Sequence, residues 1–63
     1  MADSLELIQR RVSDEIREGI TVDVYRIAAT LQQSCPDLPQ DVIVKEVSAA
    51  IAKGNGNALW NKD

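Results

Sequence analysis

The residue types that this chain lacks constrain its fold more than those that it contains. Among its 63 residues there is one cysteine, Cys35, and no histidine. A domain this short gains little stability from a single core, and the usual staples are disulfides, a bound metal or self-association. One cysteine cannot form an intrachain disulfide, and without histidine the chain cannot supply the ligands of an all-protein zinc site. We therefore expect close helix packing or an oligomer to stabilise the fold.

The composition predicts a globular helical domain with an aliphatic core. Hydrophobic residues make up 44% of the sequence, which is enough for a globular fold. Tyr25 and Trp60 are the only aromatic residues in the sequence, so leucine, isoleucine, valine and alanine must fill the core. We expect an all-α fold, a small three-helix domain with a short flexible C-terminal tail.

The first helix is expected between about Leu5 and Glu18. Asp3 and Glu6 are spaced as a capping box, in which each side chain satisfies a backbone N–H of the other residue. Gly19 is expected to end the helix in a left-handed conformation, so that Ile20 folds back onto the end of this helix. One apolar stripe follows helical spacing: Leu5, Ile8, Val12 and Ile16.

A second helix is expected from about Val22 to Gln33. Thr21 is the predicted N-cap, and Asp23 lies in the first turn, where the helix dipole favours a negative charge. Since the segment carries few charges, we expect it to be the most central helix. Cys35 precedes Pro36, which disfavours helical geometry at Cys35. Four apolar residues make the inward face: Val24, Ile27, Ala28 and Leu31.

A third helix is expected from Leu38 or Pro39 to Lys53. Asp37 and Gln40 repeat the capping-box spacing, and a proline is tolerated in a first helical turn. The β-branched run that follows could also form a strand. The cap, the early proline and an alanine-rich continuation favour the helix.

The apolar face of this third segment is wide. One stripe contains Ile43, Val47, Ala50 and Ile51, and Val44 widens it. An arc wider than one neighbour needs indicates contact on two sides. We expect an interaction surface at Val44, Val47 and Ile51, with Trp60 from the tail. The predicted core is the set of residues on the apolar stripes: Ile8, Val12, Ile16, Val24, Ile27, Leu31, Ile43, Val47 and Ile51.

The chain is expected to divide into a three-helix domain, residues 1–54, and a tail, residues 55–63, that can fold back through Leu59 and Trp60. Gly54 ends the third helix, and the glycine and asparagine residues that follow are typical of a flexible turn. Trp60 has two interpretations. Burial over the small core is favoured because it removes a large apolar side chain from water, and docking on a partner is the alternative.

The sequence offers little for catalysis. A histidine-dependent triad cannot form without histidine. Cys35 has no histidine to activate it and does not begin a helix, so we expect an inert, dispensable thiol. Asp14, Glu15 and Glu18 cluster near the end of the first helix, where solvated charge is the simpler interpretation. We predict no enzyme, and no catalytic, cofactor-binding or metal-binding residue.

Charge and hydropathy narrow the partners and the compartment. Ten acidic residues against seven basic ones give a net charge of −3, which argues against a general nucleic-acid binder. No apolar run approaches a membrane span, and the first residues lack the basic and apolar regions of a signal peptide. A single unpaired cysteine fits a reducing compartment. We expect a cytoplasmic protein with no membrane partner.

These observations predict a non-catalytic helical protein that acts through protein–protein interaction. The partner is a second copy, giving a homodimer, or a helix of another protein. The alternative is a small DNA-binding regulator in which the second and third segments form a helix-turn-helix-like pair.

Overall fold

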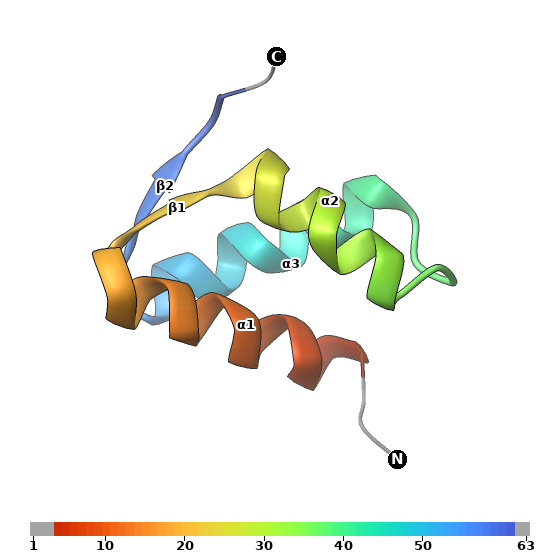
Figure 1. Cartoon of the computed structure of the whole chain (residues 1–63), viewed down its shortest axis with the longest axis horizontal. Coiled ribbons are helices and arrows are strands. Elements are labelled where there is room, and N and C mark those ends of the chain that lie inside the picture. Colours follow the sequence, from red (N-terminus) through yellow and green to blue (C-terminus); the bar gives the residue numbers. More distant parts are fainter. Residues whose placement is uncertain (1–3, 62–63) are drawn as a thin grey trace.

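The computed structural model describes residues 4–61, which form three helices and two short strands (Figure 1). The predicted three helices are confirmed, but the expectation of a strictly all-α fold is wrong, because two strands pair in parallel. The elements along the chain are α1 (Ser4–Gly19), β1 (Thr21–Asp23), α2 (Val24–Ser34), α3 (Gln40–Lys53) and β2 (Asn57–Leu59).

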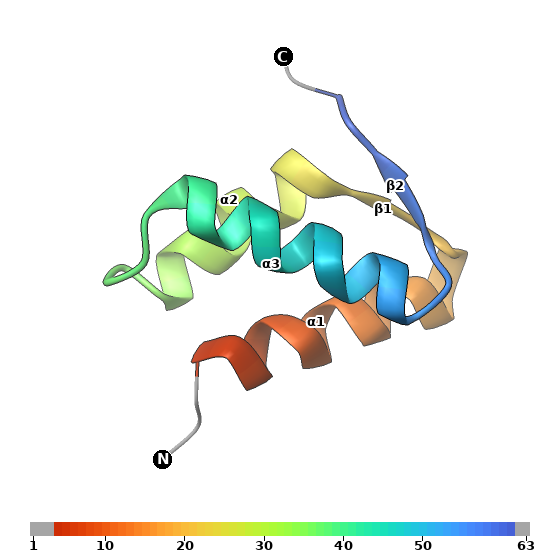
Figure 2. The same cartoon turned by 180° about the vertical axis from the view of Figure 1, so that it is seen from behind.

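Helix α3 is the central element of the fold. It packs against both α1 and α2, and Figure 2 shows it lying between them. The wide apolar arc of α3 is therefore covered on two sides within one chain. The expectation that α2 would be most central is wrong, since a low number of charges does not by itself decide which helix has two neighbours. No helix within residues 4–61 combines the length and apolar character that crossing a membrane requires.

The core is aliphatic, as predicted. All the predicted core residues are buried except Ile16, which is partly buried and packs against the cluster. Val22, Ala28 and Cys35 were not among the predicted core residues, although Ala28 was expected on the inward face of its helix, and all three are buried. The buried cluster consists of Ile8, Val12, Val22, Val24, Ile27, Ala28, Leu31, Cys35, Ile43, Val47 and Ile51.

The chain reverses direction after α1 at Ile20, and Gly19 is not the residue that takes the left-handed conformation. Ile20 has a φ of 66°, which is an uncommon value for a β-branched residue. Its N–H donates to the Ile16 carbonyl at 2.8 Å, while its own carbonyl accepts from the Asn57 N–H at 3.0 Å. The Ile20 side chain is 57% exposed and so does not fold back into the core. The predicted cap at Asp3 lies outside the described residues.

Helix α2 begins later than predicted because Thr21 belongs to β1. The N-cap is Asp23, whose Oδ1 accepts from the Arg26 N–H at 3.3 Å. At the other end, Cys35 is non-helical as predicted, with φ −127° and ψ 66°.

The turn into α3 is held differently from the prediction. Pro39 is the N-cap and offers no side-chain hydrogen bond, so the predicted capping box at Asp37 is wrong. The Gln32 amide Nε2 instead donates to the Leu38 carbonyl at 2.6 Å and to the Cys35 carbonyl at 3.4 Å. A side chain from α2 thus positions the turn that starts α3.

Helix α3 ends in a Schellman-type turn that directs the chain back toward β1. Asn55 takes the left-handed conformation, with φ 61°. The Gly56 N–H donates to the Ile51 carbonyl at 2.9 Å, and the Asn55 N–H donates to the Ala52 carbonyl at 3.3 Å. From this turn β2 enters beside β1, with Thr21 opposite Asn57 and Asp23 opposite Leu59.

Gly56 allows β2 to approach α1 closely. A Cβ at this position would lie 2.7 Å from Ile16 Cγ1 and 3.0 Å from the Ile20 carbonyl oxygen. Real Cβ atoms do not tolerate a 2.7 Å contact, so a side chain here would force Ile16 or β2 to move. The position of β2 is therefore fixed by a close backbone approach.

Candidate interaction surface

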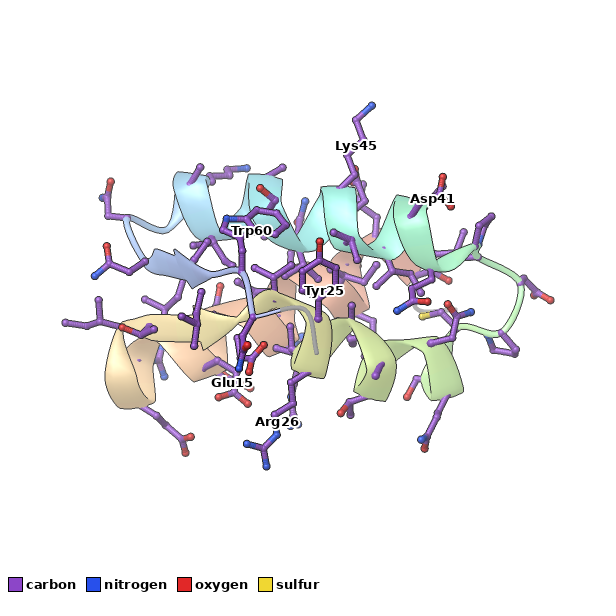
Figure 3. The ribbon with its side chains drawn as sticks, turned by 90° about the horizontal axis from the view of Figure 1, so that it is seen from above. Glu15, Tyr25, Arg26, Asp41, Lys45 and Trp60 are labelled. Carbon is purple, nitrogen blue, oxygen red and sulfur yellow. The ribbon has the colours of Figure 1, made fainter. Side chains whose placement is uncertain are left out.

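Two aromatic side chains meet where β2 ends and α2 begins. The register places Leu59 beside Asp23, so the residues that follow each strand are brought close together. The Tyr25 and Trp60 ring centroids are 5.8 Å apart, with an interplanar angle of 72°. This is an edge-to-face arrangement, which is favourable for aromatic pairs. Figure 3 shows both rings on the side of the molecule where α2 and α3 run next to each other.

Trp60 lies on the surface. It is 52% exposed, whereas Tyr25 is only partly exposed. Burying a large aromatic side chain is strongly favourable. About half of the Trp60 surface remains in water. Much of the favourable free energy of burying this side chain is therefore not realised within the single chain.

A groove of about 710 Å³ lies beside the aromatic pair. Val44 provides an apolar wall from α3, and Asp41 and Arg26 place opposite charges at its margins. The full lining comes from β1, the first turn of α2, the first half of α3 and the end of the described chain: Asp23, Tyr25, Arg26, Gln40, Asp41, Val44 and Asn61. The groove thus combines an apolar wall with charges of both signs.

The structure separates the four residues predicted for the interaction surface. Val44 lines the groove and Trp60 lies at the surface near it. Val47 and Ile51 are buried in the core, with exposures of 0% and 2%. These two residues lie one and two turns further along α3 and support the position of Val44 from within the core.

Sequence reasoning missed the part of the groove that comes from the start of α2 and α3. Tyr25 carried a usable signal, since it is one of the two aromatic residues. Gln40 and Asp41 carried none, because polar residues in the first turn of a helix are explained by capping and the helix dipole. Only the pairing of β1 with β2 brings Tyr25 to Trp60.

Among residues 4–61, the charged side chains that line the groove are of both signs: Asp23, Arg26 and Asp41. Asp41 and Lys45 project from the same side of α3 in Figure 3. On α1, Arg11 and Glu15 form an exposed ion pair at 3.4 Å, which contributes little to stability.

The residues that were considered for chemistry are not assembled into a site. Cys35 is a free cysteine that is 4% exposed. Within residues 4–61, histidine, cysteine, aspartate and glutamate side chains do not gather in any group of three that could hold a metal ion.

A second exposed apolar region lies at the two strands. Leu59 is 46% exposed and Ile20 is 57% exposed. All three residues of β2 are exposed. Trp60 directly follows Leu59 in the sequence, but successive side chains of an extended segment point to opposite faces, so Leu59 and the aromatic pair are separate exposed groups.

No protein-family model, curated protein or solved structure matches the chain.

Proposed function

We propose that this chain acts by protein–protein interaction, through self-association or by binding a helix of a partner, and that it catalyses no reaction. The observation that carries the proposal is the half-exposed Trp60 held against Tyr25 beside the groove. Tryptophan and tyrosine are enriched among the residues that dominate binding energy at protein interfaces. A rigid aromatic pair next to an apolar wall suits an inserted side chain from a helix.

Within this surface, Trp60 is the anchor and Val44 is the apolar wall. Tyr25 fixes the Trp60 ring by edge-to-face contact, which lowers the cost of ordering that side chain on binding. Val47 and Ile51 act from the core, where they hold α3 in place.

Self-association is the form of this proposal that the chain's size favours. A 63-residue chain without a disulfide in the chain gains stability from an oligomer. The closed arrangement found most often is a two-fold symmetric pair, so we propose a homodimer. A single unpaired cysteine supports a reducing compartment, such as the cytoplasm, for this proposed dimer.

The alternative function, a DNA-binding regulator with a helix-turn-helix-like pair, has less support. In such a pair α3 would enter the major groove. Asp41 and Lys45 point to the same side of α3, so a carboxylate would accompany the lysine toward the phosphates. Neutralising phosphates needs an excess of positive charge, and the net charge here is −3.

Sedimentation equilibrium over a range from about ten micromolar to about one millimolar tests the proposal, because contacts of modest area have dissociation constants in this range. We expect concentration-dependent association that is weakened at least tenfold by Trp60→Ala and by Val44→Glu. Val42→Glu is the matched control, since it makes the same substitution on the same helix at a residue that is 38% exposed and does not line the groove.

Trp60 also gives a direct optical measurement, because it is the only tryptophan. Its emission should shift to shorter wavelength as the chain associates and Trp60 leaves water. Retention on heparin that falls steeply with salt, with no association between copies, would favour the DNA-binding alternative. Equal weakening by Val42→Glu and Val44→Glu would remove the groove from the contact.

A further inference from the structure

Strand β2 has one open edge. It pairs with β1 on one side, and no other described segment pairs with it on the other side. Parallel sheets are usually covered, and a two-stranded sheet is only marginally stable without further strands or packing. An open edge presents backbone N–H and C=O groups that another strand can pair with.

The hydrogen bonds to β1 identify which groups point outward. The Asn57 N–H donates to the Ile20 carbonyl at 3.0 Å, so Asn57 directs its backbone groups toward β1. Because backbone direction alternates along a strand, Leu59 does the same, and Ala58 directs its N–H and C=O away from β1. Continued extension of the chain places the Trp60 N–H and C=O on the same open side as those of Ala58.

Strand β2 has three residues, and a short edge strand is one of the ways in which proteins protect an exposed edge. The edge lacks the other common protections, which are charged residues, proline and bulges. From Asn55 to Asn61 the sequence has no charged residue and no proline. The two strands are paired residue for residue, without a bulge.

The edge is also held in place before any partner arrives. Gly54 and Gly56 bring the chain against Ile16, so closely that a Cβ at either glycine would lie within 2.9 Å of this side chain. At the other end of β2, Trp60 contacts Tyr25. A strand fixed at both ends loses little conformational freedom when a second strand pairs with it.

We propose that β2 pairs antiparallel with β2 of a second copy of this chain, joining the two sheets into one four-stranded sheet. The two-fold axis passes at Leu59. Ala58 of each copy then lies opposite Trp60 of the other, and each of these pairs exchanges two backbone hydrogen bonds. The two Leu59 side chains, each 46% exposed in the single chain, face one another in the close, non-hydrogen-bonded pair at the centre.

The hydrogen bonds select this register over its neighbour. An axis at Ala58 would place Trp60 opposite Gly56, whose N–H already donates to the Ile51 carbonyl at 2.9 Å. An axis at Leu59 uses only Ala58 and Trp60, whose outward groups make no hydrogen bond to any other described residue.

A second copy is the partner that the strand itself fits. Ala58 and Trp60 carry the outward backbone groups and lie on either side of Leu59. A two-fold axis at Leu59 therefore pairs Ala58 of each copy with Trp60 of the other, and the register is self-complementary. Like charges directly opposite each other destabilise a pair of strands. Residues 57–59 are uncharged, so pairing β2 with its own copy brings no like charges together. This inference rests on the self-association part of the proposed function and not on the groove, because it names the strand through which two copies make contact.

Removing one backbone donor tests the pairing. Ala58→Pro deletes the outward N–H and leaves the ladder to β1 intact, since that ladder uses the groups of Asn57 and Leu59. We expect Ala58→Pro to weaken association at least tenfold in sedimentation equilibrium. Ala58→Val keeps the N–H and is the matched control, for which we expect wild-type association.

Cross-linking tests the register independently of stability. In a Cys35→Ser background, Leu59→Cys places two thiols in the central pair, at a separation that a disulfide can span. We expect this variant to form disulfide dimers in a glutathione redox buffer at least ten times faster than Asn57→Cys, which does not face its own copy. Equal rates at both positions would indicate random collision and would overturn the register.

The outcomes separate this inference from the proposed function. Association that survives Ala58→Pro but is lost in Val44→Glu overturns the strand pairing and supports contact through the groove. Association that is lost in Ala58→Pro and unchanged in Val44→Glu supports the strand pairing and removes the groove from the dimer contact. A monomer at about one millimolar overturns the strand pairing and leaves a partner helix as the occupant of the groove.

Discussion

The helical body, which consists of α1, α2 and α3, differs from the strand end, residues 20–23 and 55–60, in how completely apolar side chains are buried. In the helical body, α1 and α2 cover the wide apolar arc of α3, and the central side chains Ile43 and Val47 are 0% exposed. At the strand end, Ile20 and Asn55 take left-handed conformations, and Leu59 and Trp60 stay about half exposed. Burial of apolar side chains inside one chain therefore explains how the helices pack. It does not explain why the strand end keeps Ile20, Leu59 and Trp60 exposed.

Each region depends on a different kind of contact. The helical body is stabilised by apolar burial, which is non-directional and tolerates small shifts. The strand end depends on backbone register and on the close approach of Gly56 to Ile16, which leave little room for change. Substitutions in the two regions should therefore change the free energy of unfolding by different amounts. They should also differ in whether a second substitution can restore the lost stability.

The largest effect is expected in the helical body. Leu31 is 3% exposed, so Leu31→Ala should lower the free energy of unfolding by about 2–5 kcal/mol, comparable with the whole stability of a domain this small. Urea denaturation followed by circular dichroism measures the loss. Leu7→Ala, at a residue that is 37% exposed, is the control and should change the free energy of unfolding by less than about 1 kcal/mol. An unchanged Leu31→Ala midpoint would contradict the assignment of Leu31 to the core.

At the strand end, Gly56→Ala should destabilise by about 1–3 kcal/mol, because the new methyl group meets Ile16. A Cβ at Gly19 would have no heavy atom within 4 Å, so Gly19→Ala is the matched control and should be neutral or slightly stabilising. If the clash is the cause, Ile16→Ala with Gly56→Ala should lose less stability than the sum of the two single changes. Simple additivity in this double-mutant cycle would contradict the proposed cause.

Cys35→Ser tests whether the core extends into the turn before α3. The side chain is 4% exposed, so a hydroxyl in its place should lower the free energy of unfolding by about 1–3 kcal/mol. Association between copies should be unchanged once the variant is folded, since the thiol has no part in either contact surface. Loss of association in a folded Cys35→Ser chain, or in the wild type on reduction, would contradict this dispensable role.

The smallest effect should be a gain. Ile20 has a φ of 66° and a side chain that is 57% exposed, so Ile20→Asn relieves backbone strain and loses little burial. We expect a rise of about 1 kcal/mol in the free energy of unfolding. Ile20→Val remains β-branched and should show no rise. A loss of stability in Ile20→Asn would mean that the Ile20 side chain contributes more packing than its exposure indicates.

The sequence by itself determined the helical body. Each helix carries an apolar stripe at a spacing of three or four residues, and Pro36 ends α2 by restricting its neighbour Cys35. These signals act over one or two turns of chain, so they can be detected without the tertiary structure. The same signals identified the predicted core, with Ile16 as the partly buried exception.

Only the tertiary structure decided the strand end and the candidate surface. Thr21 pairs with Asn57 although the two residues are far apart in the sequence, and three-residue strands are too short to show an alternating pattern. The sequence around Gly56 predicted a flexible turn. In the structure, Gly56 instead allows the backbone to lie in close contact with Ile16. Tyr25 and Trp60 meet only because that pairing aligns the ends of both strands, a long-range contact that no local pattern of residue types encodes.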